Sequence, residues 1–256
     1  MGLSVLNFFI ENDHLIAQPT NIQYTVVLDT LLFAEYTVQR IQAITNDTYT
    51  MWSAGRYAEL RDLSLCRLTM FNGRRGNEPA RIELADWQDA QNGVWVNSNN
   101  VERLSQVEQQ LLADNRLIYI PGKGQHLVPV IVPQDTVRAL ELLADEHIRR
   151  DSSVYHANTY LFPSTHLSAD HAGGWHAVQR FCKELGIAMG AINATKVRHH
   201  ISTLYAALDV PAEQRDIFYR HMGHSASTNA NIYQAPLAEA EMLRVGSMLR
   251  QFESGR

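Results

Sequence analysis

Two short apolar runs, residues 117–120 and 127–132, are the clearest strand signal in a sequence whose other apolar residues recur mostly at helical spacing. Both runs are rich in β-branched or aromatic residues, and the six residues between them include two glycines, which is typical of a β-hairpin. A third run, Val94–Val96, also predicts a strand. We therefore expect a mainly α-helical α+β fold around a small antiparallel sheet.

Apolar residues three and four positions apart predict the helices. One helix is expected over residues 25–44, and a second over about residues 56–71, where Asn72-Gly73 ends it. The same periodicity predicts helices at residues 134–150, 174–185, 196–208, 212–221, 227–233 and 237–252.

Length and composition narrow the class of protein. With 256 residues and 45% hydrophobic composition, the chain can form one full domain with a small appendage. Cys66 and Cys182 lie in apolar helix-like stretches and are expected to be buried free thiols, which fits a reducing compartment. The most apolar stretch, residues 24–44, is interrupted by charges, so neither a signal peptide nor a membrane span is expected.

The net charge of −5 is unusual for a protein that binds nucleic acid, but it is unevenly distributed. Residues 1–50 contain one basic side chain, Arg40, and five acidic ones, which gives −4. Subtracting −4 from −5 leaves only −1 for residues 51–256. The acidity therefore lies mainly in the first 50 residues.

The most informative motif is His221-Met222-Gly223-His224-Ser225, followed by Tyr233 nine residues after His224. Arg198-His199 stands upstream, at the head of a predicted helix. This arrangement resembles the tyrosine recombinase and phage integrase family, in which a Gly-His-Ser segment precedes the nucleophilic tyrosine by nine residues. A Crypton-type, eukaryotic-transposon-like member is one form that the resemblance allows. It implies the family's catalytic-domain fold, mainly helical with a small antiparallel hairpin.

Three further segments match the family in the same order, so the resemblance covers about residues 52–245. The turn from Asn72 to Glu78 is similar to the family's Gly-x-Arg-x-x-Glu motif, which assigns the catalytic arginine to Arg75 and its supporting carboxylate to Glu78. Gly122-Lys123-Gly124 is similar to the family's lysine hairpin. Leu161-Phe162-Pro163-Ser164 matches a family segment that lies between the lysine hairpin and the Arg198-His199 pair.

The resemblance implies a reaction at a DNA phosphodiester. Arg75 and Arg198 would hold the non-bridging oxygens, because forked guanidinium donors suit such oxygens better than point charges do. His224 would donate another hydrogen bond, and Lys123 would protonate the departing 5′ oxygen. Tyr233 would form a 3′-phosphotyrosyl ester that conserves the energy of the broken bond. No metal, nucleotide or other cofactor is implied.

The sequence departs from the family at two places. Thr195 stands where the family usually has a histidine, three residues before the second arginine, and threonine cannot act as a base near neutral pH. Lys196 and His199 are the candidates to compensate. Residues 1–50 are expected to be a short helical segment, the remnant or end of a core-binding domain plus a linker, ahead of a catalytic domain at 51–256. A complete DNA clamp is therefore not expected in this chain.

Other readings of the same residues remain open. Taken singly, Tyr233 is an ordinary half-buried helix aromatic, and Lys123 is an exposed hairpin lysine. Arg74 rivals Arg75; if Arg75 is catalytic, Arg74 is expected to face solvent or DNA, as is Lys196. His221 and His224 have the spacing of two zinc ligands on one helical face, but no third ligand lies at a recognised interval.

We expect double-stranded DNA as the partner, in an intracellular setting that is nuclear in a eukaryote and cytoplasmic in a bacterium or phage. The family implies a homo-tetramer on DNA, in which the helix after the tyrosine, residues 237–252, docks on a neighbouring copy. Two alternatives are kept. One is a type IB topoisomerase-like nicking and closing enzyme, and the other is a catalytically weak DNA-binding derivative.

Overall fold

A computed structural model describes residues 21–75, 77–122, 127–165, 167–188, 190–207, 210–223, 225–228 and 248–250. The chain divides into two compact units. The larger unit is Leu32–Gly190, and the smaller unit combines Met1–Leu31 with Ala191–Arg256. The described residues form helices and one two-stranded antiparallel sheet, which confirms the expected mainly helical α+β fold.

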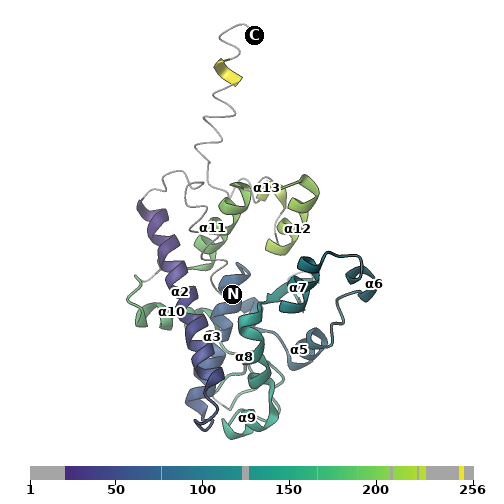
Figure 1. Ribbon diagram of the computed structural model, residues 1–256. Helices are drawn as coiled ribbons and strands as arrows, with labels where there is room; N and C mark the ends of the chain where they lie inside the picture. Colours follow the sequence, from purple (N-terminus) through teal and green to yellow (C-terminus); the bar gives the residue numbers. More distant parts are fainter. Residues whose placement is uncertain are drawn as a thin grey trace. The chain divides into compact units, whose positions relative to one another are not determined.

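Helix α3 (Ala54–Phe71) is central to the larger unit and packs against α8 (Gln134–Ala144) and α10 (Gly174–Glu184) (Figure 1). It also contacts strand β2 (Leu127–Val132). Ser53 caps its start, since the Ser53 hydroxyl accepts the Arg56 N–H at 3.3 Å. Between its ends, apolar side chains pack the core of the unit; they include Tyr57, Leu60, Leu63, Leu65, Cys66 and Leu68. This core agrees with the predicted second helix.

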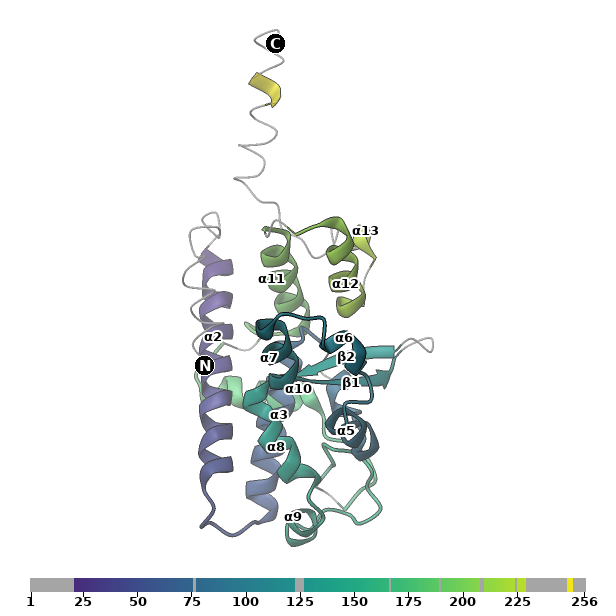
Figure 2. The ribbon, with the colours of Figure 1, turned by 45° about the vertical axis from the view of Figure 1, so that its right-hand side comes forward.

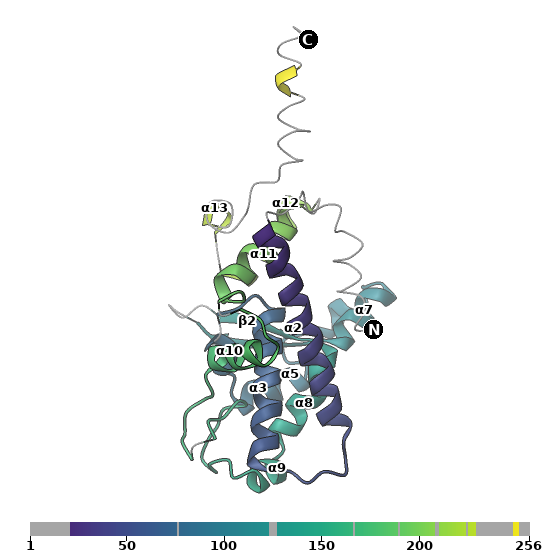
Figure 3. The same cartoon turned by 90° about the vertical axis from the view of Figure 1, so that its left-hand side faces the viewer.

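Helix α2 (Asn21–Asn46) begins in the smaller unit, and its part within the larger unit runs alongside α3 (Figure 3). In its part within the larger unit, Phe33 and Ile41 are fully buried, and Arg40 forms an ion pair with Glu59 of α3. No helix among the described residues is long and apolar enough to cross a membrane. Cys66 and Cys182 are both buried free thiols, as expected.

The predicted hairpin is confirmed: β1 (Arg116–Pro121) and β2 (Leu127–Val132) pair antiparallel, with Ile118 opposite Val130 (Figure 2). The predicted strand at Val94–Val96 is wrong, because these residues form a turn after α5 (Leu84–Gln91). Gly93 adopts φ of +66°, and the Val94 N–H bonds to Asp89 O at 3.1 Å. All three residues are exposed, so no pleated neighbour or buried face stabilises a strand there.

The helix predicted over residues 134–150 is two helices, α8 and α9 (Glu146–Asp151). Asp145 interrupts them with an extended backbone, and its carboxylate accepts the Ile148 N–H at 2.9 Å, which begins α9. The larger unit also contains the short helices α4 (Asn77–Ala80) and α6 (Ser98–Val101), and the longer α7 (Gln106–Asp114).

In the smaller unit, the described helices are α11 (Ala194–Ala207), α12 (Ala212–Met222) and α13 (Ala226–Thr228). Tyr205 of α11 stacks on Phe218 of α12 with ring centroids 3.8 Å apart and planes 8° from parallel. The Tyr205 hydroxyl also donates to Gln214 O at 3.2 Å. Most of the predicted helices at 227–233 and 237–252 lies outside the described residues.

Candidate functional site

The predicted arginine motif begins at the C-terminal end of α3. The Gly73 N–H bonds to Met70 O and the Arg74 N–H to Thr69 O, at 3.2 and 3.0 Å, which is the double closure of a Schellman motif. Gly73 takes φ of +57°, a left-handed conformation that glycine adopts without steric cost. Asn72-Gly73 therefore stops the helix and aims the following arginines away from its axis.

Arg74 and Arg75 differ sharply in exposure. Arg74 is 3% exposed, and its Nη2 donates to Pro129 O of β2 at 2.8 Å. The Arg75 side chain is 65% exposed. The expectation that Arg74 faces solvent therefore does not hold, whereas Arg75 is accessible to a ligand. Which of them contacts DNA stays a prediction.

Glu78, at the start of α4, lies between the two arginines. Its carboxylate oxygens are 3.9 Å from Arg74 Nη1 and 4.0 Å from Arg75 Nη1, and one of them accepts the Arg75 main-chain N–H at 3.4 Å. The structure thus brings Arg74, Arg75 and Glu78 together. A carboxylate in this place can orient both guanidinium groups.

In the smaller unit, the second predicted arginine lies in the first turns of α11. Asn193 caps this helix, because its side-chain oxygen accepts the Lys196 N–H at 2.9 Å. Thr195 and Lys196 are exposed, whereas Arg198 is 3% exposed. The three-residue spacing puts Thr195 and Arg198 on the same side of the helix.

Arg198 Nη2 donates a hydrogen bond to the carbonyl oxygen of Met222, the last residue of α12. Met222 is itself 1% exposed. Gly223 follows in the left-handed conformation, φ +67° and ψ +35°, and closes α12. Arg198 is therefore bonded to the residue directly before Gly223-His224. The two bonded residues, Arg198 and Met222, are 24 residues apart along the chain and belong to the two ends of the sequence motif.

Three of the predicted catalytic residues, Lys123, His224 and Tyr233, lie outside the described residues, so their roles stay predictions. Arg75 belongs to the larger unit and Arg198 to the smaller one. Within the described part of the chain, no group of three or more His, Cys, Asp or Glu side chains could hold a metal ion.

The histidines of α11 have different surroundings. Burial lowers the pKa of His200 from 6.5 to about 4, so this imidazole is neutral near neutral pH. His199 is partly exposed, as is His221 on α12. A neutral, partly buried His200 suits packing between elements better than anion binding.

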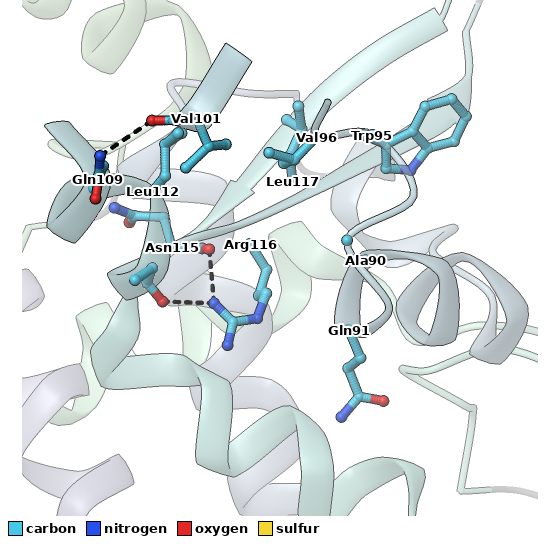
Figure 4. A pocket seen from close by; sticks show the side chains of 12 residues that line it. Ala90, Gln91, Trp95, Val96, Val101, Gln109, Leu112, Asn115, Arg116 and Leu117 are labelled. Carbon is cyan, nitrogen blue, oxygen red and sulfur yellow. Dashed lines mark hydrogen bonds between the residues drawn. The ribbon is translucent and has the colours of Figure 1, made fainter. Parts of the chain in front are cut away.

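A pocket of about 280 Å³ lies in the larger unit between α5, α7 and the start of β1 (Figure 4). Leu112, Val96 and Leu117 give it an apolar lining. Arg116 is turned to the main chain and donates to Ala113 O and Asn115 O, at 2.7 and 2.9 Å. None of the predicted site residues lines this pocket.

Comparison with known proteins gives few matches. No family model matches the chain, and no curated protein matches its sequence. Among solved structures, the chain is similar to XerH site-specific recombinase bound to palindromic difH substrate in a post-cleavage complex, with 16% identity and a TM-score of 0.49. A pre-cleavage complex of XerH with difH gives 17% and 0.48. The alignments cover 83% and 81% of this chain but only 51% and 50% of those chains, about half their length.

Proposed function

We propose that the chain breaks and rejoins DNA strands through a 3′-phosphotyrosyl intermediate at Tyr233, as a tyrosine recombinase does. The single observation that supports this most is the hydrogen bond from Arg198 to the Met222 carbonyl. It links the Arg-His segment to the Gly-His-Ser segment, two motifs that the sequence resemblance requires to act on one phosphate.

In the proposed reaction, Tyr233 attacks the phosphorus and the bond to the 5′ oxygen breaks. Arg75 and Arg198 stabilise the charge that develops on the non-bridging oxygens, and His224 donates to the same group. Arg75 is exposed enough to reach a phosphate without displacing a partner from the core. Lys123 gives its proton to the departing 5′ oxygen, so a 5′-hydroxyl can later reverse the step.

The test is covalent capture of DNA. Purified full chain is incubated with a pool of end-labelled, nicked duplexes of randomised sequence, and the products are separated under denaturing conditions. We expect a protein-linked band that is absent in Tyr233→Phe. If wild type binds the duplexes and leaves no such band, the proposal is wrong.

A catalytically weak DNA-binding derivative is the second candidate, and Thr195 is the observation that favours it. This side chain is exposed at the start of α11, where the family usually has a histidine, and it supplies no base. Thr195→His separates the two candidates, because it should raise adduct formation only in a chain that otherwise retains the chemistry. Relaxation of supercoiled plasmid without a second DNA site would indicate the topoisomerase-like variant.

A further inference from the structure

The pocket between α5, α7 and the start of β1 is walled by segments that their own polar side chains hold together (Figure 4). Gln109 Nε2 donates to Val101 O at 3.2 Å, and Asn115 Nδ2 donates to Leu111 O at 2.6 Å. Like Arg116, these donors are turned to main-chain oxygens, which leaves apolar side chains to form most of the lining. The pocket is therefore apolar, and its shape exists before any ligand binds.

Exposed apolar side chains continue from this pocket along α7. Trp95, Val96 and Leu112 line the pocket and are exposed. Val107 and Leu111, four residues apart on one face of α7, are exposed to 70% and 58%. A patch of neighbouring exposed apolar side chains commonly marks an interaction site. We call these side chains, together with the pocket, the α7 surface.

The α7 surface has an acidic rim. Residues 83–114, which form α5, α6 and α7, contain six acidic side chains and one basic one, Arg103, which gives −5. Subtracting −5 from the −1 of residues 51–256 leaves +4 for the rest of that range. Asp89, Glu102 and Glu108 are exposed, and each is next in sequence to a residue that lines the pocket. The apolar surface is therefore bordered by negative charge.

This charge selects among the possible occupants of the surface. It repels DNA phosphates, and a twofold contact between two copies of the chain would place the same carboxylates opposite each other. The longest stretches of the chain outside the described residues, 1–20 and 229–247, carry net charges of −2 and −1. None of these occupants complements a negative rim, whereas a segment with basic side chains does.

We propose that the α7 surface binds a basic amphipathic helix of a partner protein. Such a helix lays its apolar face in the apolar groove, and its Lys and Arg side chains meet the acidic rim. The pocket, about 280 Å³, is smaller than the roughly 300–1000 Å³ of sites for drug-sized ligands, so it suits one anchoring side chain of the helix. Trp95, whose ring contacts that of Tyr119 edge-on with centroids 4.9 Å apart, is held ready to contact this anchor. This binding is independent of the DNA chemistry proposed above.

The probe is a fluorescein-labelled peptide of about 18 residues, long enough to form a helix, with leucines at helical spacing on one face and lysines elsewhere. A Leu/Glu peptide keeps the leucine positions and reverses the charge, and a scrambled Leu/Lys peptide keeps the composition and loses the apolar face. By fluorescence anisotropy, the full chain should bind the amphipathic Leu/Lys peptide at least about 10-fold more tightly than the other two. Equal binding of either comparison peptide, or no binding of the amphipathic Leu/Lys peptide, would overturn the proposal.

Leu111→Gln locates the bound peptide. It removes an exposed apolar side chain, keeps a good helix former, and should weaken binding of the amphipathic Leu/Lys peptide about 10-fold. Ile217→Gln is the matched control, because Ile217 lies on α12 and is 61% exposed, against 58% for Leu111. This control should bind the peptide as wild type does. Equal affinities of the two variants would place the peptide elsewhere on the chain and overturn the proposal.

Asp89→Lys combined with Glu102→Lys tests the acidic rim. Both carboxylates are exposed and lie outside the capping boxes that Asp86 and Glu108 complete, so the fold should be kept. The double variant should lose the amphipathic Leu/Lys peptide and gain the Leu/Glu peptide, and an unchanged preference would overturn the role of the rim. Sedimentation tests the rival occupant. A wild-type chain that self-associates, and is monomeric as Leu111→Gln, would show that a second copy covers the surface and would overturn the choice of partner.

Discussion

The two regions that carry the predicted phosphate-binding arginines hold them in opposite ways. In the larger unit, Arg75 is exposed and the residues before it are buried and fastened to β2. In the smaller unit, Arg198 is itself buried against a carbonyl, whereas Thr195 and Lys196, in the same first turn, are exposed. A guanidinium has five N–H donors, so Arg198 can keep its carbonyl bond while offering others to a phosphate. The comparison teaches that one arginine is placed by its neighbours and the other by its own hydrogen bond.

The largest expected effect comes from the polar core of the larger unit. Asp62, 5% exposed, accepts from Arg61 at 2.7 Å and from Arg180 of α10 at 2.8 Å. Asp62→Ala leaves Arg61 buried without its carboxylate and should lower the free energy of unfolding by about 3–5 kcal/mol. Urea denaturation measures this loss. Glu141→Gln, which removes an exposed pair with Arg138, should cost less than about 1 kcal/mol, and equal losses would contradict the argument.

Next comes a direct test of the two arginines. Arg75→Met and Arg198→Met should each slow adduct formation by about 100- to 1000-fold, because each removes a donor from the charged transition state. Only Arg198→Met should also destabilise the fold, by about 1.5–3 kcal/mol, since only Arg198 donates a buried charged hydrogen bond. Cleavage rates and unfolding curves of both variants check this split. A stability loss in Arg75→Met as large as that in Arg198→Met would remove the contrast.

The smallest expected effect concerns pH. Burial lowers the pKa of His200 to about 4, whereas in the unfolded chain it returns to about 6.5. Between these values the unfolded state binds the proton and the folded state does not, so stability falls as the pH drops from 6.5 to 4. His200→Asn should flatten this part of the dependence of the unfolding temperature on pH. An unchanged slope in the variant would show that other groups control acid stability.

Much of the fold follows from local signals in the sequence, and the errors have physical causes. The hairpin and α3 were predictable because their apolar patterns extend over their whole length. The strand predicted at Val94–Val96 does not form, because β-branched residues stabilise a strand only when a neighbour covers them. The apolar periodicity does not predict α7, because most of its residues are polar. Its start is nevertheless marked in the sequence, since Ser105 and Glu108 form a capping box.

The site is less predictable than the fold. The sequence could place Arg75 and Arg198 in motifs, but it could not separate Arg74 from Arg75, because they are adjacent and chemically identical. What distinguishes them is the Pro129 carbonyl, 55 residues away along the chain. The sequence indicates Asn72 only as a helix stop, because its bonds to Ile131 depend on tertiary packing that no local pattern encodes.

Buried Arg149 has a consequence for how this chain can change during evolution. Its guanidinium donates to main-chain oxygens of Asn158 and Tyr160, at 2.7 and 3.1 Å, and to the Tyr57 hydroxyl at 3.3 Å. A donor that binds main-chain carbonyls is insensitive to the side chains those residues carry. Many substitutions at Tyr160 and the exposed positions near it should therefore leave this anchor intact. The loop after α9 should therefore vary at its exposed positions while its path over the core is kept.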